Sequence, residues 1–159
     1  MRITHKAVAI LAAAVSFSGL TVLNSGTATA AVPVTASLQA QSDSTNLDEY
    51  LGATMLTRDP GLTYQTWTLT PLGDGSYTVK GNHYGKCLVS NGLGANVTQQ
   101  ACNANDLAQR WYLDPGVNGT AIASAKYLGT ALQANGLDRP ATTELALGTS
   151  DQKWTAYVK

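Results

Sequence analysis

The chain has 159 residues, and its ten basic and ten acidic side chains leave no formal net charge at pH 7. Its lysines and arginines are scattered singly, whereas a protein that binds nucleic acid needs them gathered into a basic patch. Composition therefore argues against a nucleic-acid partner.

Residues 1–30 have the pattern of a secretory signal peptide. Arg2 and Lys6 give a positive start, a long apolar stretch follows, and small residues precede a cleavage point before Ala31. A retained membrane anchor is the alternative, but polar residues interrupt the apolar stretch, which falls slightly short of the roughly 20 residues that span a bilayer. We expect one secreted, extracellular domain over residues 31–159, without membrane contact after cleavage.

The remaining sequence predicts an all-β fold. Residues 32–35 are rich in β-formers, residues 76–80 and 154–158 alternate apolar with polar side chains, and turn residues recur every eight to twelve positions. Residues 41–50 are polar, and we interpret them as a loop that lengthens the first part of the domain.

Three copies of a Gln-x-Trp motif use all three tryptophans of the chain, at spacings of 44 and 43 residues. A buried Trp needs a partner for its N–H, so one period for every copy predicts equivalent core positions in three repeats, at about 31–70, 71–114 and 115–159. We expect the Gln amides to bond backbone at the repeat junctions. The motif residues are Gln65 and Trp67, Gln109 and Trp111, and Gln152 and Trp154.

The first two tryptophans are each followed, seven and eight residues on, by a turn dipeptide. These dipeptides are Asp74-Gly75 and Asn118-Gly119, which are typical of tight β-hairpins. The chain ends five residues after Trp154, so the third strand needs another partner. Pairing with residues 32–35 would close the sheet into a barrel and bring the two ends together.

With these features, residues 32–159 resemble the ricin B-type β-trefoil lectins, which carry three repeats of roughly forty residues with one Gln-x-Trp each. The middle repeat matches best, because Gly85-Lys86-Cys87-Leu88 and Cys102-Asn103 precede its Gln-x-Trp in the family's order. The resemblance implies a β-trefoil with pseudo-threefold symmetry and a lectin-like function.

Cys87 and Cys102 are the two cysteines of a chain that we expect to be exported, so a disulfide between them is the predicted state. Two free buried thiols are the alternative. No metal site is predicted, because the exported chain retains a single histidine, His83, and its cysteines are expected to be paired.

In the family, a sugar site combines a carboxylate two residues after the Cys of Gly-x-Cys-Leu-Asp, an aromatic ring near the second Cys, and an Asn just before Gln-x-Trp. None of the repeats carries this triad intact. We place the three positions at Val89, Gln100 and Ala108 in the middle repeat, at Gln133, Ala146 and Asp151 in the third, and at Gln39, Leu56 and Tyr64 in the first. Gln39 matches Gln133 because residues 36–40 resemble residues 130–134.

The third repeat is the best remaining candidate for a sugar site. Its polar residues are Gln133, Asn135, Asp138 and Asp151, with Tyr127 or Tyr157 as stacking rings. The alternative is that these residues only form turns, as exposed Asn and Asp often do.

Catalysis is not expected, because the sequence has no Gly-x-Ser-x-Gly motif and no supported Cys–His pair. We therefore expect a carbohydrate-binding module without cofactors, whose partner is an oligo- or polysaccharide of galactose or xylose type. The alternative is a trefoil that has lost sugar binding and contacts a secreted protein, as an inhibitor or adhesion factor, through residues 41–50 and 58–61.

Overall fold

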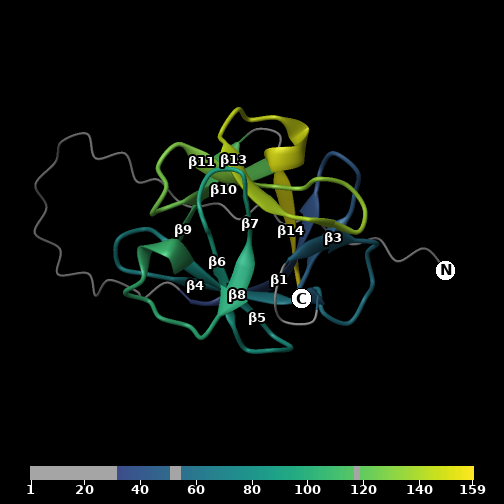
Figure 1. Ribbon diagram of the computed structural model, residues 1–159. Helices are drawn as coiled ribbons and strands as arrows, with labels where there is room; N and C mark the ends of the chain where they lie inside the picture. The colour runs from purple at the N-terminus through teal and green to yellow at the C-terminus, as the bar shows by residue number, and fades with distance from the viewer. Residues whose placement is uncertain (1–31, 51–54, 117–118) are drawn as a thin grey trace, which may run out of the picture.

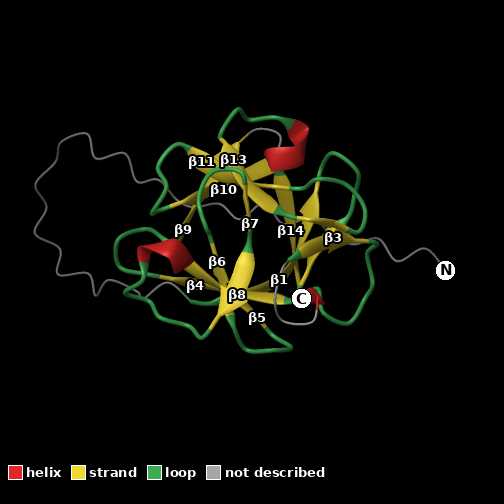
Figure 2. Cartoon of the chain, in the orientation of Figure 1, coloured by secondary structure: helices red, strands yellow, loops and turns green. Residues whose placement is uncertain are grey.

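The computed structural model describes residues 32–50, 55–116 and 119–159 (Figure 1). These residues form strands and turns, with 3-10 helix only in short segments that include η2 (Leu107–Gln109) and η3 (Ser150–Gln152), as Figure 2 shows. The all-β prediction is confirmed. Nowhere in these ranges is there a helix long and apolar enough to cross a membrane.

Six strands form a closed barrel. They pair antiparallel in the cyclic order β1, β4, β5, β9, β10, β14 and back to β1, so none of them is a free edge. Their bounds are β1 (Val34–Ala40), β4 (Trp67–Pro71), β5 (Tyr77–Gly81), β9 (Trp111–Gly116), β10 (Gly119–Ser124) and β14 (Trp154–Val158).

Three further hairpins lie around one centre, as Figure 1 shows. They pair β2 (Asn46–Asp48) with β3 (Leu56–Arg58), β6 (Cys87–Val89) with β8 (Thr98–Gln100), and β11 (Thr130–Gln133) with β13 (Thr142–Leu145). The two-residue strands β7 (Ala95–Asn96) and β12 (Arg139–Pro140) connect neighbouring hairpins by pairing with β13 and β3.

A ring of three backbone hydrogen bonds marks the pseudo-threefold axis. The amide of Met55 donates to the carbonyl of Val97 at 3.0 Å, Val97 donates to Ala141 at 2.9 Å, and Ala141 donates back to Met55 at 2.8 Å. All three residues are fully buried. The fold is therefore the predicted β-trefoil, with one equivalent residue from each repeat at its centre.

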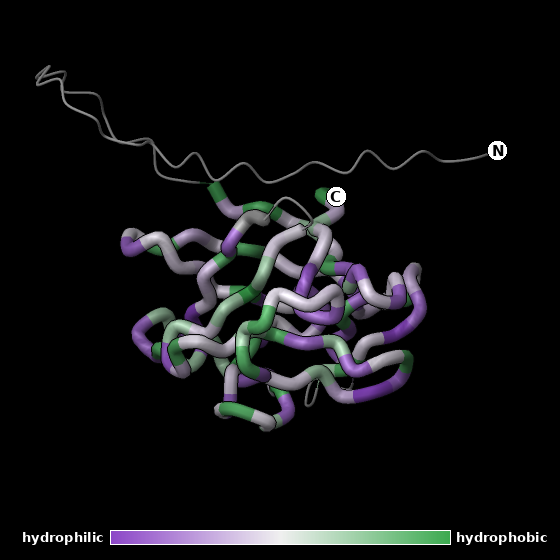
Figure 3. Tube along the Cα trace, turned by 90° about the horizontal axis from the view of Figure 1, so that it is seen from above, coloured by the Kyte–Doolittle hydropathy of each residue, from purple (hydrophilic) through white to green (hydrophobic). Residues whose placement is uncertain are grey.

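The two ends of the domain pair as predicted, but through Ala36–Ala40 of β1, whereas Val34 and Thr35 of the expected segment 32–35 pair with β4. Strand β14 lies against β1 from Ala36↔Val158 to Ala40↔Trp154, and the amide of Lys159 donates to the carbonyl of Thr35 at 3.0 Å. Figure 3 accordingly shows the first described residues and the C-terminus on the same side of the molecule. The β4–β5 hairpin around Asp74 is also confirmed, whereas Asn118 lies outside the described residues.

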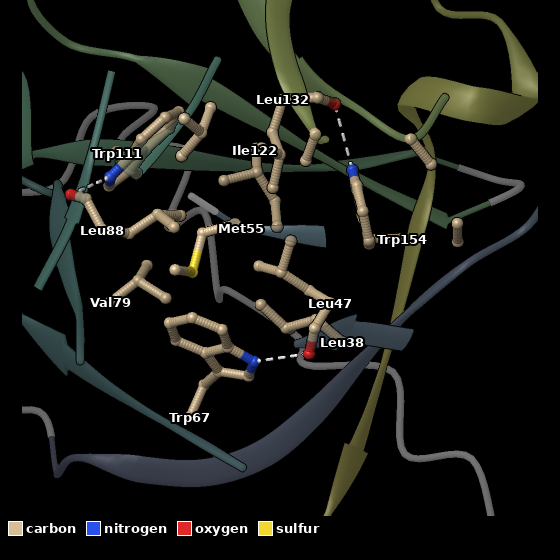
Figure 4. Close-up of a cluster of buried hydrophobic side chains, with 14 of the residues drawn as sticks. Leu38, Leu47, Met55, Trp67, Val79, Leu88, Trp111, Ile122, Leu132 and Trp154 are labelled. Atoms are coloured by element: carbon tan, nitrogen blue, oxygen red, sulfur yellow. Dashed lines mark hydrogen bonds between the residues drawn. The ribbon is translucent and has the colours of Figure 1, made fainter. Parts of the chain in front are cut away.

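The three tryptophans occupy equivalent places in one core, which Figure 4 shows in close-up. Each ring is at most 1% exposed. Each indole N–H donates to the carbonyl of a buried leucine on the hairpin of its own repeat: Trp67 to Leu47 at 3.0 Å, Trp111 to Leu88 at 3.1 Å, and Trp154 to Leu132 at 3.1 Å. These bonds satisfy the one polar group of each buried ring.

The tryptophan bonds correct the expected alignment of the first repeat. Leu47, not Leu38, is the counterpart of Leu88 and Leu132. Leu38 instead lies on barrel strand β1. The prediction that residues 41–50 form a loop is accordingly wrong for Asn46–Asp48, which form strand β2 with all three side chains buried.

The predicted disulfide between Cys87 and Cys102 is confirmed. In the third repeat, Ala131 and Ala146 stand at the corresponding positions. Cys87 pairs with Gln100, which lies two residues before Cys102, and Ala131 pairs with Glu144, which lies two residues before Ala146. Ala131 is buried and Ala146 is exposed, as are Cys87 and Cys102 respectively.

We predict that Ala131→Cys combined with Ala146→Cys forms a second disulfide and raises the free energy of unfolding by about 2–3 kcal/mol, because it closes a loop of the same length as the native bridge. Thiol titration and denaturant unfolding would check this. The variant with Cys87→Ala and Cys102→Ala should lose a similar amount. Free thiols at 131 and 146 under oxidising conditions would contradict the equivalence of the two repeats.

Candidate functional site

The strand pairing gives the positions of the family's sugar site in each repeat. Asp48 on β2 pairs with Leu56, Val89 on β6 pairs with Thr98, and Gln133 on β11 pairs with Thr142, so these three hold the same place. Asp48, and not Gln39, is thus the first repeat's residue at the carboxylate position.

The aromatic position also shifts from the predicted residues. Arg58, Gln100 and Glu144 stand opposite the equivalent residues Asn46, Cys87 and Ala131, so Arg58 replaces the expected Leu56 and Glu144 replaces Ala146. None of the three is aromatic.

The third position is as predicted in every repeat. The carbonyls of Tyr64, Ala108 and Asp151 each accept a hydrogen bond of 2.9 Å from the amide that follows the carboxylate position. The donors of these bonds are Glu49, Ser90 and Ala134.

The glutamines of the Gln-x-Trp motifs connect the hairpins to the loops behind them. The amide group of Gln152 donates to the carbonyl of Leu145 at 2.7 Å and to Oε1 of Gln133 at 2.9 Å. Gln65 likewise donates to the carbonyl of Asp59 at 2.8 Å and to Oδ2 of Asp48 at 3.2 Å. A buried glutamine therefore orients the residue at the carboxylate position in the first and third repeats.

In the third repeat, Gln133 and Asp151 are brought together around Gln152. Gln133 is half-buried, and its Nε2 donates to Oδ1 of Asn135 at 3.1 Å. Asp151 lies within η3, and its carbonyl accepts a hydrogen bond from the amide of Ala134 at 2.9 Å. Its carboxylate makes no hydrogen bond with any described residue, and its Oδ1 is buried. No described residue therefore uses this carboxylate as an acceptor, and its second oxygen, Oδ2, is not among the buried unpartnered atoms.

Asn135 lies beside Gln133 but also has a local structural role. Its Nδ2 donates to the carbonyl of Pro140 at 2.7 Å and to the hydroxyl of Thr142 at 3.0 Å. Asn91 makes the same pair of bonds in the second repeat, where the carboxylate position holds Val89. The amide of Asn135 therefore closes the turn of its own hairpin.

Asp138 lies at a different place from the other three predicted residues. Its backbone has φ 56°, its amide donates to the carbonyl of Thr57 at 2.7 Å, and its carboxylate accepts from Nε of Arg58 at 3.1 Å. The loop that carries Asp138 thus reaches across to the first repeat, which spacing in the sequence does not show.

The two tyrosines predicted to stack lie on other parts of the molecule. A Cβ added to Gly92 of the second repeat would lie 3.6 Å from Cε1 of Tyr127. Tyr157 stands on barrel strand β14 opposite Ser37. Neither has a ring contact with another aromatic side chain in the described part of the chain.

In the first repeat, the carboxylate of Asp48 is fully buried. Its Oδ2 accepts from Gln65, its Oδ1 has no partner, and burial raises the pKa of Asp48 above its ordinary value. The guanidinium of Arg58, whose charge acts on Asp48, lies 5.6 Å from the ring centre of Tyr50. This carboxylate is therefore covered, and it does not face solvent as a sugar-binding group must.

Asp48 is the residue that the sequence-based alignment missed. A signal was present, because Leu47-Asp48 repeats the Leu-Asp of the family's Gly-x-Cys-Leu-Asp, but Asn46 stands where the cysteine is expected. The residues 36–40 offered a more similar string on the wrong strand.

The comparison with protein families shows which family the chain belongs to. The model of the ricin-type beta-trefoil lectin domain matches residues 38–154, and the chain belongs to this family. No curated protein sequence matches it significantly.

Solved structures with the same fold include the designed threefold-symmetric protein ThreeFoil, with 26% identity and a TM-score of 0.70 over 77% of this chain and 97% of that one. The Rhizoctonia solani agglutinin has 21% identity and a TM-score of 0.71, over 81% and 98% of the two chains. The C-terminal half of an earthworm R-type lectin, solved with GalNAc, has 12% identity and a TM-score of 0.61, over 79% and 99%. The last two are similar in fold.

We predict that Asp48→Asn becomes progressively more stable than the unsubstituted protein as the pH rises from 3 to 7. A raised pKa means that the folded chain holds the Asp48 proton more tightly than the unfolded chain. Ionisation above the ordinary value of 3.8 therefore lowers stability. Denaturant unfolding across this pH range would check it.

Asp74→Asn is the control with the opposite sign. Hydrogen bonds from Ser76, with Arg110 nearby, lower the pKa of Asp74. The ionised carboxylate therefore stabilises the folded chain above pH 3.8, and this stabilisation is lost as the pH falls. Asp74→Asn should therefore be less stable than the unsubstituted protein at pH 7, and this difference should shrink in acid. Parallel pH profiles for both variants would contradict the burial argument.

Proposed function

We propose that the chain is a secreted, non-catalytic carbohydrate-binding module whose third repeat supplies a sugar-binding site. The family suggests the carbohydrate class of ligand. The Cys87–Cys102 disulfide fits the oxidising environment outside the cytosol that the signal-peptide pattern predicts.

The observation that carries the site is the unused carboxylate of Asp151 beside Gln133. A carboxylate binds a sugar by accepting hydrogen bonds from its hydroxyl groups, and that of Asp151 accepts none from the described residues. Gln133 is held by Gln152 on one side and Asn135 on the other, yet its amide retains one N–H and one lone pair. The two side chains thus offer an acceptor and an oriented amide at one end of a rigid hairpin.

The other two repeats offer less at these positions. The second has Val89 and Ala108, which cannot bond a hydroxyl. The first has Asp48, which is buried beneath its neighbours. Glu144 at the aromatic position adds a second half-buried carboxylate to the third repeat. Polar groups suited to sugar hydroxyls are therefore concentrated in the third repeat.

The test is binding of the oxidised protein to immobilised oligo- and polysaccharides, with soluble galactose, xylose and lactose as competitors. We expect saturable retention, with affinity in the roughly millimolar to micromolar range per site. Gln133→Ala combined with Asp151→Ala should lower it about tenfold or more, because both hydroxyl-bonding groups are lost.

Asn91→Ala is the matched control, because Asn91 closes the second-repeat hairpin as Asn135 closes the third. Its retention should be unchanged once circular dichroism shows that it is folded. If the unsubstituted protein binds no glycan, the sugar function is wrong, and secreted protein partners become the alternative. If it binds and the double variant binds equally, the third-repeat site is wrong.

A further inference from the structure

One cluster of exposed side chains has no part in the third-repeat site. Tyr64, at the end of the first repeat, packs against His83 and Tyr84 in the turn between β5 and β6 of the second repeat. The ring centres of Tyr64 and His83 are 4.1 Å apart, those of His83 and Tyr84 4.6 Å, and those of Tyr64 and Tyr84 5.8 Å. We call these three residues the seam cluster. Theirs are the only contacts between aromatic rings among the described residues.

A buried carboxylate holds the turn of the seam cluster in place. Glu49 is fully buried, and it accepts hydrogen bonds from the backbone amides of His83 at 2.8 Å and Tyr84 at 3.1 Å, and from Nε2 of Gln99 at 3.2 Å. Gly81 lies directly against this carboxylate, where a Cβ would collide with it. Three donors and this close packing fix the backbone beneath the rings, so that a ligand meets a preorganised surface.

No described residue bonds the polar edges of the seam cluster. Neither the hydroxyls of Tyr64 and Tyr84 nor the ring nitrogens of His83 make a hydrogen bond with any described residue. His83 and Tyr84 are exposed, and Tyr64 is half-buried. The cluster therefore presents ring faces and free hydrogen-bonding groups on the same small surface.

The equivalent seams of the molecule lack this combination. The residues that correspond to Tyr64 are Ala108 and Asp151, whose carbonyls accept the equivalent backbone hydrogen bonds at the other two junctions. The turn equivalent to residues 83–84 holds Ser42 and Asp43 in the first repeat and Tyr127 and Leu128 in the third, where Tyr127 contacts no other aromatic ring of the described residues. The pseudo-threefold fold therefore requires none of these rings, and burial of apolar surface in the core does not account for them.

We infer that the seam cluster is a second carbohydrate-binding surface, which stacks on the apolar face of a neutral pyranose and bonds its hydroxyls. A pyranose has an apolar face edged by hydroxyls, which matches ring faces edged by unused donors and acceptors. A neutral ligand fits better than an anion, because the buried carboxylate of Glu49 lies directly under the turn. A protein partner would need about 800 Å² on this side, far more than three partly exposed rings supply.

This inference rests on the proposed function for the class of ligand, but it concerns a different surface. Tyr64 also stands at the third sugar position of the first repeat, but His83 and Tyr84 stand at none of the three positions. The aromatic position of the first repeat holds Arg58, which is engaged with Tyr50 and Asp138.

The first test uses the unsubstituted protein. His83 is the only histidine after residue 31, so the NMR signals of its ring protons report on this cluster alone. Titration with the neutral oligosaccharides that the protein retains should shift or broaden these signals saturably. Unchanged His83 signals at saturating sugar would overturn the inference, even where signals around Asp151 shift and the proposed function stands.

The second test compares affinities by titration calorimetry. His83→Ala combined with Tyr84→Ala should lower the affinity about tenfold or more, at about three- to tenfold for each ring removed. Tyr84→Phe retains the ring and should keep most of the affinity. Tyr112→Ala is the matched control, because Tyr112 on β9 is 40% exposed against 36% for Tyr84.

His83→Ala combined with Tyr84→Ala should lower the affinity for sugar also in a protein that already carries Gln133→Ala and Asp151→Ala. Equal affinity with and without the two rings would overturn the second surface and leave the third-repeat site standing. Absence of any glycan binding by the unsubstituted protein would overturn both proposals together.

Discussion

The fold depends on one interaction that is made three times, the hydrogen bond from a buried tryptophan N–H to a leucine carbonyl of the same repeat. A buried donor without a partner costs about 1–3 kcal/mol, so each ring must lie where a free carbonyl is in reach. Trp67, Trp111 and Trp154 all meet this condition, because each contacts the first strand of the hairpin in its own repeat, β2, β6 or β11. The bond joins a barrel strand to a hairpin in each repeat, and the hairpins then meet at the ring of Met55, Val97 and Ala141.

The seams between repeats show how much chemistry this constraint leaves free. The equivalent residues Thr57, Gln99 and Thr143 each make a hydrogen bond to the neighbouring repeat, but their partners are a backbone carbonyl, a carboxylate and a hydroxyl. What the core requires is that each buried polar group be satisfied, and several kinds of side chain can do this. The symmetry is thus strict in the backbone and loose in the side chains at the seams, even where these side chains are buried.

Particular residues show where sequence reasoning succeeded and where it failed. The period of Gln-x-Trp correctly predicted the three buried tryptophans and the threefold organisation of the fold. The lack of a third hairpin after Trp154 correctly predicted that its strand pairs with the start of the domain. The first repeat was misaligned because residues 36–40 resemble residues 130–134, whereas Leu47 stands alone among polar residues. Only the bond from Trp67 to Leu47 distinguishes the two alignments, and it moves the carboxylate position from Gln39 to Asp48.

The sequence by itself determined the fold class, the number of repeats, the disulfide and the family, because each of these follows from residue types that recur at a constant spacing. Only the tertiary structure decided which residues share a surface. Asp138 bonds Arg58 across 80 positions, Asp48 is buried while Asp151 keeps a free carboxylate, and Tyr64 meets His83 and Tyr84 at a seam between repeats. The physical reason is that a closed barrel brings the ends of different repeats into contact, and no local pattern records which side chains then meet.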